Sequence, residues 1–107
     1  MLTIDEFAKV ELKVATIVAA EAHPNADRLL VLRIDLGDET RQLVAGIRAH
    51  YQPEELIGKQ IVVVANLEPA KLRGVESQGM LLAATDAEGR LAIVTPEKPV
   101  AAGAKVK

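Results

Sequence analysis

The feature that most restricts the fold is a succession of short apolar segments, each ended by turn residues. Alternating apolar and polar residues indicate a half-buried strand, and a short continuous apolar run indicates a strand buried on both faces. Strands are predicted at residues 10–18, 29–36, 41–47, 61–67, 79–84, 91–94 and 104–106. Only two short helical segments are predicted, residues 4–9 and 53–56. The succession therefore predicts an all-β domain.

The order of these elements indicates one architecture. Thr3 and Glu6 have capping-box spacing at the start of the first helix, whose expected anchor is Phe7. The second helix begins with Pro53 and lies between the third and fourth strands. Five strands with a helix after the third is the order of the OB-fold, a Greek-key barrel. We expect one domain over residues 1–107, with extra N- and C-terminal elements around the barrel.

Two local details follow from the strand patterns. The alternation of the first strand slips at Ala15–Thr16, which predicts a β-bulge there. The segment after residue 84 lies outside the five barrel strands, and the prolines and Gly103 near its end predict a tail packed against the barrel. Because Phe7 and Tyr51 are the only aromatic residues, the core has to be aliphatic.

The residue content argues against several classes of function. Cysteine is absent, which excludes disulfides, thiolate metal sites and cysteine nucleophiles and suits a cytoplasmic protein. His23 and His50 are far apart, and no nucleotide-loop, dinucleotide or zinc-protease motif occurs, so we assign no catalytic residue and no cofactor. No apolar run approaches the roughly 18 residues of a membrane span, and no signal peptide is recognised, so no membrane partner is expected.

One loop contains three potential metal ligands, His23, Asn25 and Asp27. Asparagine and aspartate commonly order a turn through their own side chains, and three such residues on one short loop are weak evidence for a metal site. We therefore favour a structural turn and predict no metal.

The segment 66–80 is the most informative part of the chain. It joins two predicted strands by a connection far longer than a hairpin needs, and such long loops are usually functional. Its candidate RNA-binding side chains are two cations suited to phosphates and three polar groups suited to sugars or base edges: Lys71, Arg73, Asn66, Ser77 and Gln78. An ordinary solvated loop, with its cations balanced by neighbouring acids, is the alternative interpretation.

Other cations can extend such a surface. Arg33 and Lys13 are assigned by parity to the non-core faces of their strands, and Arg28 lies at a loop edge. Each is equally interpretable as an ordinary surface charge. The chain has 13 basic and 15 acidic residues, so any nucleic-acid surface has to arise from local clustering.

The segment 66–80 also resembles the signature of the tRNA-binding OB-domain family, through Asn66-Leu67, Pro69, Lys71–Gly74 and Ser77–Met80. The resemblance extends over residues 3–107. This family includes free-standing structure-specific tRNA-binding proteins, C-terminal domains of methionyl-tRNA synthetases, cytokine-like factors and a chaperone-like branch. The resemblance implies non-catalytic binding of tRNA by shape, with a synthetase as a possible partner, and it puts Met80 at the floor of the groove.

The scarcity of aromatic residues agrees with a folded RNA, because binders of single strands stack bases on aromatic side chains. A protein-interaction module, either chaperone-like or for dimerisation, with weak RNA affinity is the alternative of a different class. A homodimer is also expected, because apolar residues outside the barrel need cover: Leu2, Ile4, Phe7, Leu91, Ile93 and Val94. The resemblance supports pairing, since the cytokine-like relatives carry an added C-terminal domain over the corresponding face.

Overall fold

The computed structural model describes all 107 residues. It contains two short helices and ten strands: α1 (Ile4–Phe7), β1 (Leu12–Ala22), β2 (Leu30–Asp35), β3 (Thr40–Ala45), α2 (Pro53–Leu56), β4 (Gln60–Val64), β5 (Ala70–Leu72), β6 (Val75–Ser77), β7 (Met80–Leu81), β8 (Ala83–Thr85), β9 (Leu91–Ile93) and β10 (Lys105–Val106). Neither helix has the length and apolar character that crossing a membrane requires.

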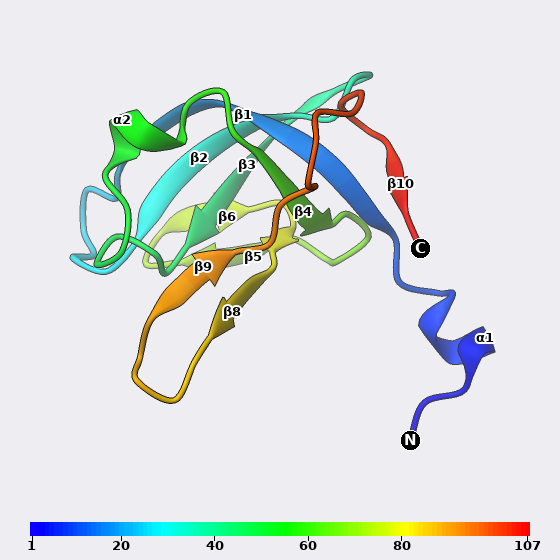
Figure 1. The fold of residues 1–107 in the computed structure, drawn as a ribbon. Helices are drawn as coiled ribbons and strands as arrows, with labels where there is room; N and C mark the ends of the chain where they lie inside the picture. The colour runs from blue at the N-terminus through cyan, green and yellow to red at the C-terminus, as the bar shows by residue number, and fades with distance from the viewer.

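The main sheet is antiparallel and curves into a barrel with the strand order β3-β2-β1-β4-β7, while β10 pairs with the start of β1 (Figure 1). After the β1–β2–β3 meander, the chain passes through α2 and returns as β4 beside β1, which is the Greek-key step. The predicted all-β OB-fold, with its helix after the third strand, is confirmed.

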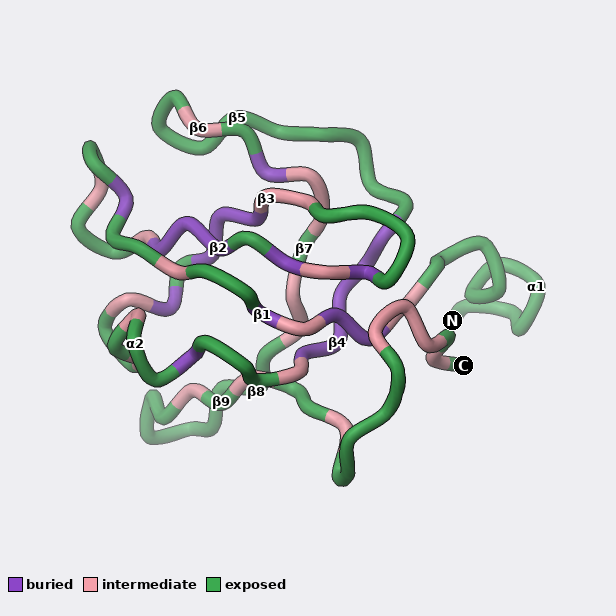
Figure 2. The backbone as a smooth tube through the Cα atoms, turned by 90° about the horizontal axis from the view of Figure 1, so that it is seen from above, coloured by how far each residue is buried: buried purple, intermediate pink, exposed green.

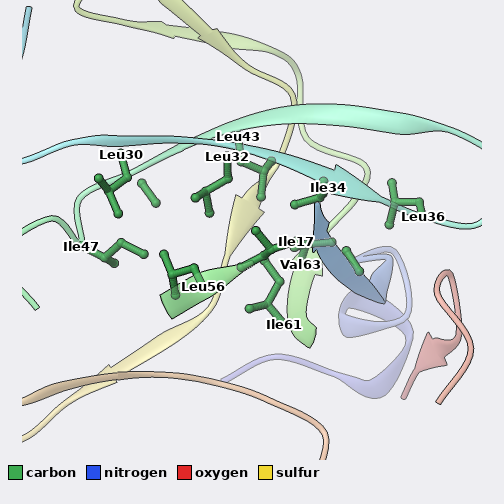
Figure 3. Close-up of a cluster of buried hydrophobic side chains, with 12 residues drawn as sticks. Ile17, Leu30, Leu32, Ile34, Leu36, Leu43, Ile47, Leu56, Ile61 and Val63 are labelled. Atoms are coloured by element: carbon green, nitrogen blue, oxygen red, sulfur yellow. The ribbon is translucent and has the colours of Figure 1, made fainter. Parts of the chain in front are cut away.

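The core fills the inside of this curved sheet and is entirely aliphatic. Its members come from β1 to β4, from the segments that follow β2 and β3, and from α2 (Figure 3): Ala15, Ile17, Leu30, Leu32, Ile34, Leu36, Leu43, Ala45, Ile47, Leu56, Ile61 and Val63. Tyr51 packs against its edge, and the Tyr51 hydroxyl accepts a hydrogen bond from the backbone N–H of Ile93 at 3.1 Å.

The first strand does contain a bulge, but the predicted position is wrong. The register of β1 against β2 skips Val18, whereas Ala15–Thr16 is paired regularly. The pattern misleads because Val14 and Ala15 are both buried, although only Ala15 belongs to the core cluster. Successive residues of a strand point to opposite faces, so both faces of β1 are covered here. The C-terminal tail lies beside this part of β1, where the backbone N–H of Gly103 donates to the carbonyl of Val14 at 2.7 Å.

The C-terminal tail packs on the barrel, as predicted. Gly103 has a φ of +89°, and a Cβ at this position would clash with the backbone carbonyl of Leu36. Glycine is therefore needed both for its conformation and for the close approach of the tail to the end of β2.

The N-terminal helix has the predicted capping box, with reciprocal bonds of 3.1 Å between Thr3 and Glu6. It ends at Phe7 rather than Lys9, buries no residue, and stands away from the barrel (Figures 1 and 2). Phe7 is 41% exposed, so it does not anchor the helix within the chain.

The predicted buried strand over residues 79–84 is wrong in extent and burial. Only β7 joins the barrel, and Met80 on it is 49% exposed. After Leu82 the chain leaves the barrel, and β8 pairs with β9 in a separate two-stranded sheet. Leu91 and Ile93 turn back to pack against the core and are half-buried, so they need less cover than predicted.

Candidate nucleic-acid interface

The long segment 66–80 is an ordered β-hairpin rather than an open loop. β5 and β6 pair from Ala70 opposite Ser77 to Leu72 opposite Val75, which leaves a two-residue tip. At this tip Arg73 has a φ of +53° and Gly74 a φ of +88°. Two consecutive positive φ angles define the type I′ turn, whose twist suits a tight hairpin. Arg73 is therefore held at the exposed tip, with Lys71 exposed on the adjoining strand.

The base of the hairpin closes the barrel along β3. The backbone N–H of Gln42 donates to the Gln78 side-chain oxygen at 2.9 Å, and the N–H of Val44 donates to the Ser77 hydroxyl at 3.0 Å. These N–H groups lie on the edge of β3 that does not pair with β2. Together with the backbone bond from the Gln78 N–H to the carbonyl of Gln42 at 2.8 Å, these two side chains satisfy an edge of β3 that would otherwise be open.

The tip of the hairpin is tied to the β1–β2 loop by His23, which is only 3% exposed. Its Nε2 lies 2.9 Å from the carbonyl oxygen of Leu72, and its Nδ1 accepts the backbone N–H of Asn25 at 2.9 Å. Both views show the hairpin beside β3 with its tip toward the β1–β2 loop (Figures 1 and 2). The loop that carries Arg28 is consequently part of the same surface as the hairpin.

The outer face of β2 and β3 continues this surface. Arg33 is exposed and pairs across the sheet with Gln42, whose side-chain amide donates to the carbonyl of Glu76 on β6 at 2.8 Å. A shallow hollow of about 200 Å³ lies beside Arg33, bordered by Ala19 and by one acid, Glu21. Strand, hairpin and loop together form the known ligand-binding side of an OB barrel.

The candidate cations are free of ion pairs. The three ion pairs of the chain use only Arg41, with Glu39, and Arg90, with Asp86 and Glu88. None of the five predicted cations is neutralised by an acid within 4.0 Å: Lys13, Arg28, Arg33, Lys71 and Arg73. Cations without an acidic partner can bind phosphate without first breaking an ion pair.

Arg41 has a structural role that its sequence position did not reveal. Its guanidinium bonds the Glu39 carboxylate at 2.8 Å and also donates to the carbonyls of Ala65 and Gln78, at the ends of the strands beside the hairpin base. The bond to Glu39 raises the pKa of Arg41, and the same bond lowers the pKa of the Glu39 carboxyl. This residue therefore braces the hairpin base.

All three predicted polar site residues are already bonded within the fold, Gln78 through the bond to Gln42 described above. The Asn66 amide donates to the carbonyl of Lys9 and accepts from the N–H of Glu11, which fixes the chain between α1 and β1. Ser77 is 4% exposed, and its hydroxyl also donates to the carbonyl of Gly79 at 2.9 Å. A direct RNA contact from Ser77 would have to break these bonds, so the structure gives it a supporting role.

Two further predicted residues lie away from the tip. Met80 borders a shallow, mainly apolar hollow of about 230 Å³ between β3 and β7. Lys13 pairs directly opposite the core residue Val63, and directly opposed residues point to the same face of a sheet. The prediction that Lys13 lies on the non-core face is therefore wrong. Lys13 is half-buried near the start of β1, at the end of that strand remote from the β1–β2 loop.

Two residues that the sequence analysis did not assign to the site, His23 and Gln42, form hydrogen bonds between its elements. His23 was considered as a catalytic residue and as a metal ligand but not as a structural one, yet both its ring nitrogens bond to protein groups. Gln42 was not singled out, although it joins β2, β3 and β6. The only sequence signal for Gln42 is that it is a polar residue inside a strand that also carries apolar residues. The only signal for His23 is that it is a histidine directly after a strand.

Comparison with known proteins agrees with this geometry. Residues 12–105 match the family model described as "Putative tRNA binding domain". The chain is 58% identical over 106 residues to the methionine–tRNA ligase of Thermococcus kodakarensis. This match covers 99% of the chain and only 14% of the ligase, so the chain spans a small part of the length of this relative.

Solved structures show the same likeness over whole chains. The MetRS-related protein from Pyrococcus horikoshii superposes with a TM-score of 0.94 at 39% identity, covering 100% of this chain and 98% of that one. The chaperone CsaA from Bacillus anthracis superposes with a TM-score of 0.90 at 30% identity, covering 100% and 99%. The family model matches most of this chain, and the structure has the OB barrel and the β5–β6 hairpin. The chain therefore belongs to the tRNA-binding domain family.

Proposed function

We propose that this domain binds the folded surface of tRNA through phosphates and sugars, and that it serves a methionyl-tRNA synthetase as a non-catalytic accessory. One observation carries the proposal: four exposed cations without ion pairs lie on a surface formed by the β1–β2 loop, the outer face of β2 and the β5–β6 hairpin. They are Arg28, Arg33, Lys71 and Arg73. Phosphate contacts position a nucleic acid without reading its sequence.

The surface suits folded RNA better than single strands. Neither aromatic residue belongs to it, because Phe7 is on α1 and Tyr51 packs against the core edge beside β9. Without a stacking platform the domain lacks the usual means of holding unpaired bases. A folded RNA offers a fixed array of phosphates and 2′-hydroxyls, which cations and amides can meet.

The partnership with a synthetase is supported by the relatives. The methionine–tRNA ligases that resemble this chain are about seven times its length, so a domain of this kind can be one part of such an enzyme. A tethered or associated tRNA-binding domain raises the effective concentration of tRNA near the catalytic part. We place this partnership in the cytoplasm.

A salt titration with folded tRNA tests the binding proposal. Each phosphate contact releases counterions, so about four contacts predict that log K falls with log salt with a slope of about −3 to −4. Fluorescence anisotropy between 50 and 300 mM salt measures the slope, and a single strand of matched length and charge is the control. Equal affinity for the two RNAs, or affinity insensitive to salt, would refute recognition of folded RNA through phosphates.

We further propose that the domain is a homodimer. The N-terminal segment presents exposed apolar side chains outside the barrel, with Leu2 at 72%, Ile4 at 79% and Phe7 at 41% exposure. No part of the same chain covers α1, and a second copy is the occupant we propose for this face. Sedimentation at micromolar protein should give twice the chain mass, and a clean monomer that binds tRNA tightly would exclude the pair.

The chaperone-like alternative is favoured by one observation, the likeness to the chaperone CsaA over the whole chain. The same exposed apolar residues would then hold unfolded protein segments. The salt titration separates the two functions, because a chaperone-like module would bind an unfolded polypeptide and show weak, salt-insensitive affinity for tRNA.

A further inference from the structure

The outer part of the β5–β6 hairpin forms few hydrogen bonds to the rest of the fold. Ala70, Lys71 and Leu72 are all exposed, and the base is bonded to β3 only from Glu76 onward. An isolated two-stranded hairpin is marginally stable in water. Its tip therefore needs an attachment if Lys71 and Arg73 are to be presented in one orientation.

That attachment is a single hydrogen bond. Apart from the β5–β6 pairing of the hairpin itself, the hydrogen bond between His23 and the carbonyl of Leu72 is the only one that joins residues 67–75 to the rest of the fold. Leu72 directly precedes Arg73. The bond thus fixes the backbone immediately before the tip, 49 residues away in sequence from the histidine.

The local geometry determines how the imidazole is used. A backbone N–H only donates, so the Nδ1 that receives Asn25 N–H is unprotonated, and the proton of the neutral ring is on Nε2. Nε2 therefore donates to the carbonyl oxygen of Leu72. His23 and Ser77 are the two buried polar residues of the chain, and both support this hairpin.

We propose that His23 is a positioning residue for tRNA binding: it latches the hairpin tip to the β1–β2 loop so that Lys71 and Arg73 meet phosphates together with the cations of the loop and β2. The inference rests on the proposed tRNA-binding function. Its physical basis is preorganisation, because a tip that is already fixed loses less conformational entropy when RNA binds.

Two substitutions separate the latch from the general packing of the loop. His23→Gln places an amide N–H₂ near the position of Nε2 and keeps a donor for Leu72, while it loses the acceptor for Asn25. His23→Asn places an oxygen near the position of Nδ1 and keeps that acceptor, while it loses the reach to Leu72. Both remove the imidazole from the same buried site, so each is the control for the other.

We expect His23→Gln to retain the wild-type tRNA affinity within about twofold, and His23→Asn to weaken it about fivefold to tenfold, with a salt slope shallower by about one or two. Hydrogen exchange of the backbone amides of residues 71–76 provides a readout without RNA, and it should accelerate in the Asn variant only. Thermal melts show that each variant is folded under the assay conditions.

The outcomes distinguish the latch from the function it serves. Wild-type protein that fails to bind tRNA would overturn the proposed function, while the exchange rates would still test the latch. An Asn variant with wild-type affinity and wild-type exchange would overturn the latch, as would equal losses of affinity in both variants.

Discussion

Arg73 combines an exposed charge with a backbone conformation that most side chains avoid. A non-glycine residue in the left-handed region costs about 1 kcal/mol, and the first position of a type I′ turn favours asparagine or glycine. Such strain persists where the surrounding structure holds it, and it is concentrated at functional sites. The hairpin thus carries a cation where folding alone would select a smaller residue.

Substituting this residue should move stability and affinity in opposite directions. Arg73→Asn should raise the free energy of unfolding by about 0.5–1 kcal/mol, because asparagine tolerates the left-handed conformation. It should weaken tRNA binding by about 1 kcal/mol, close to fivefold, through the lost phosphate contact. Lys71→Ala is the matched control and should lose similar affinity without the gain in stability. Denaturant unfolding and anisotropy measure the two quantities, and undiminished affinity in the Arg73, Lys71 double variant would remove the hairpin from the site.

Ser77 should behave differently, because its hydroxyl is buried and bonded on both sides. Ser77→Ala leaves the N–H of Val44 and the carbonyl of Gly79 without this partner, which should lower the free energy of unfolding by about 1–3 kcal/mol. The affinity of the protein that remains folded should not change, because the side chain and the backbone of Gln78 still bond the hairpin base to Gln42. The predicted direct contact would instead be supported by a loss of affinity at unaltered melting temperature.

At the scale of elements, α1 and the barrel are nearly independent. The helix has four residues and none of them is buried, and the Asn66 amide bonds only the backbone of the segment that follows it. A helix this short is not stable through its own hydrogen bonds, so its apolar residues need a partner surface. We attribute that role to the second copy in the proposed dimer.

Deleting residues 1–8 should therefore leave the barrel folded and remove the dimer. We expect the melting temperature of the barrel to change by only a few degrees, because no core residue is lost. Sedimentation should shift to the monomer, and tRNA affinity should fall because two linked sites become one. The double variant Ile4→Ser, Phe7→Ser tests the same contact without shortening the chain, and a dimer that survives both changes would place the interface elsewhere.

At the scale of the whole molecule, the aliphatic core is the main source of stability, and surface charges change that stability only slightly. The carboxyls of Glu39 and Asp86 both have a lowered pKa, through hydrogen bonds to Arg41 and Arg90 respectively. Of these two pairs, only Glu39–Arg41 lies at the hairpin base that closes the barrel, where Arg41 also donates to the carbonyls of Ala65 and Gln78. The second closes the turn of the separate β8–β9 hairpin.

A group whose pKa is lowered on folding stabilises the protein above its unfolded pKa, and the contribution is lost as the pH falls through the folded pKa. For Glu39 this loss begins below about pH 4.3, the ordinary value of a glutamate. Glu39→Gln should make the fall in melting temperature with acid less steep there, by a small and salt-screened amount. Asp86→Asn is the control in the remote hairpin. Parallel acid profiles of wild type and Glu39→Gln would show that the Arg41 brace does not depend on this charge.

The sequence by itself determined the elements whose signals are local. Strand alternation, the capping box at Thr3, the proline at the start of α2 and the element order were sufficient for the OB architecture, because each depends on neighbours a few residues apart. The segment 66–80 and its exposed cations were recognisable for the same reason. Residue type and spacing allowed either a phosphate-binding surface or an ordinary solvated loop, and the resemblance to the tRNA-binding family favoured the first.

Only the tertiary structure decided what each of those residues does. Ser77 meets Val44 across 33 positions of sequence and His23 meets Leu72 across 49, so no local pattern separates them from turn or loop residues. The bulge and the face of Lys13 were mispredicted for one reason, because Val14 is buried although it lies outside the core cluster. A hydrogen bond or a buried face between distant segments depends on where the chain returns, and that is settled by the packing of the whole barrel.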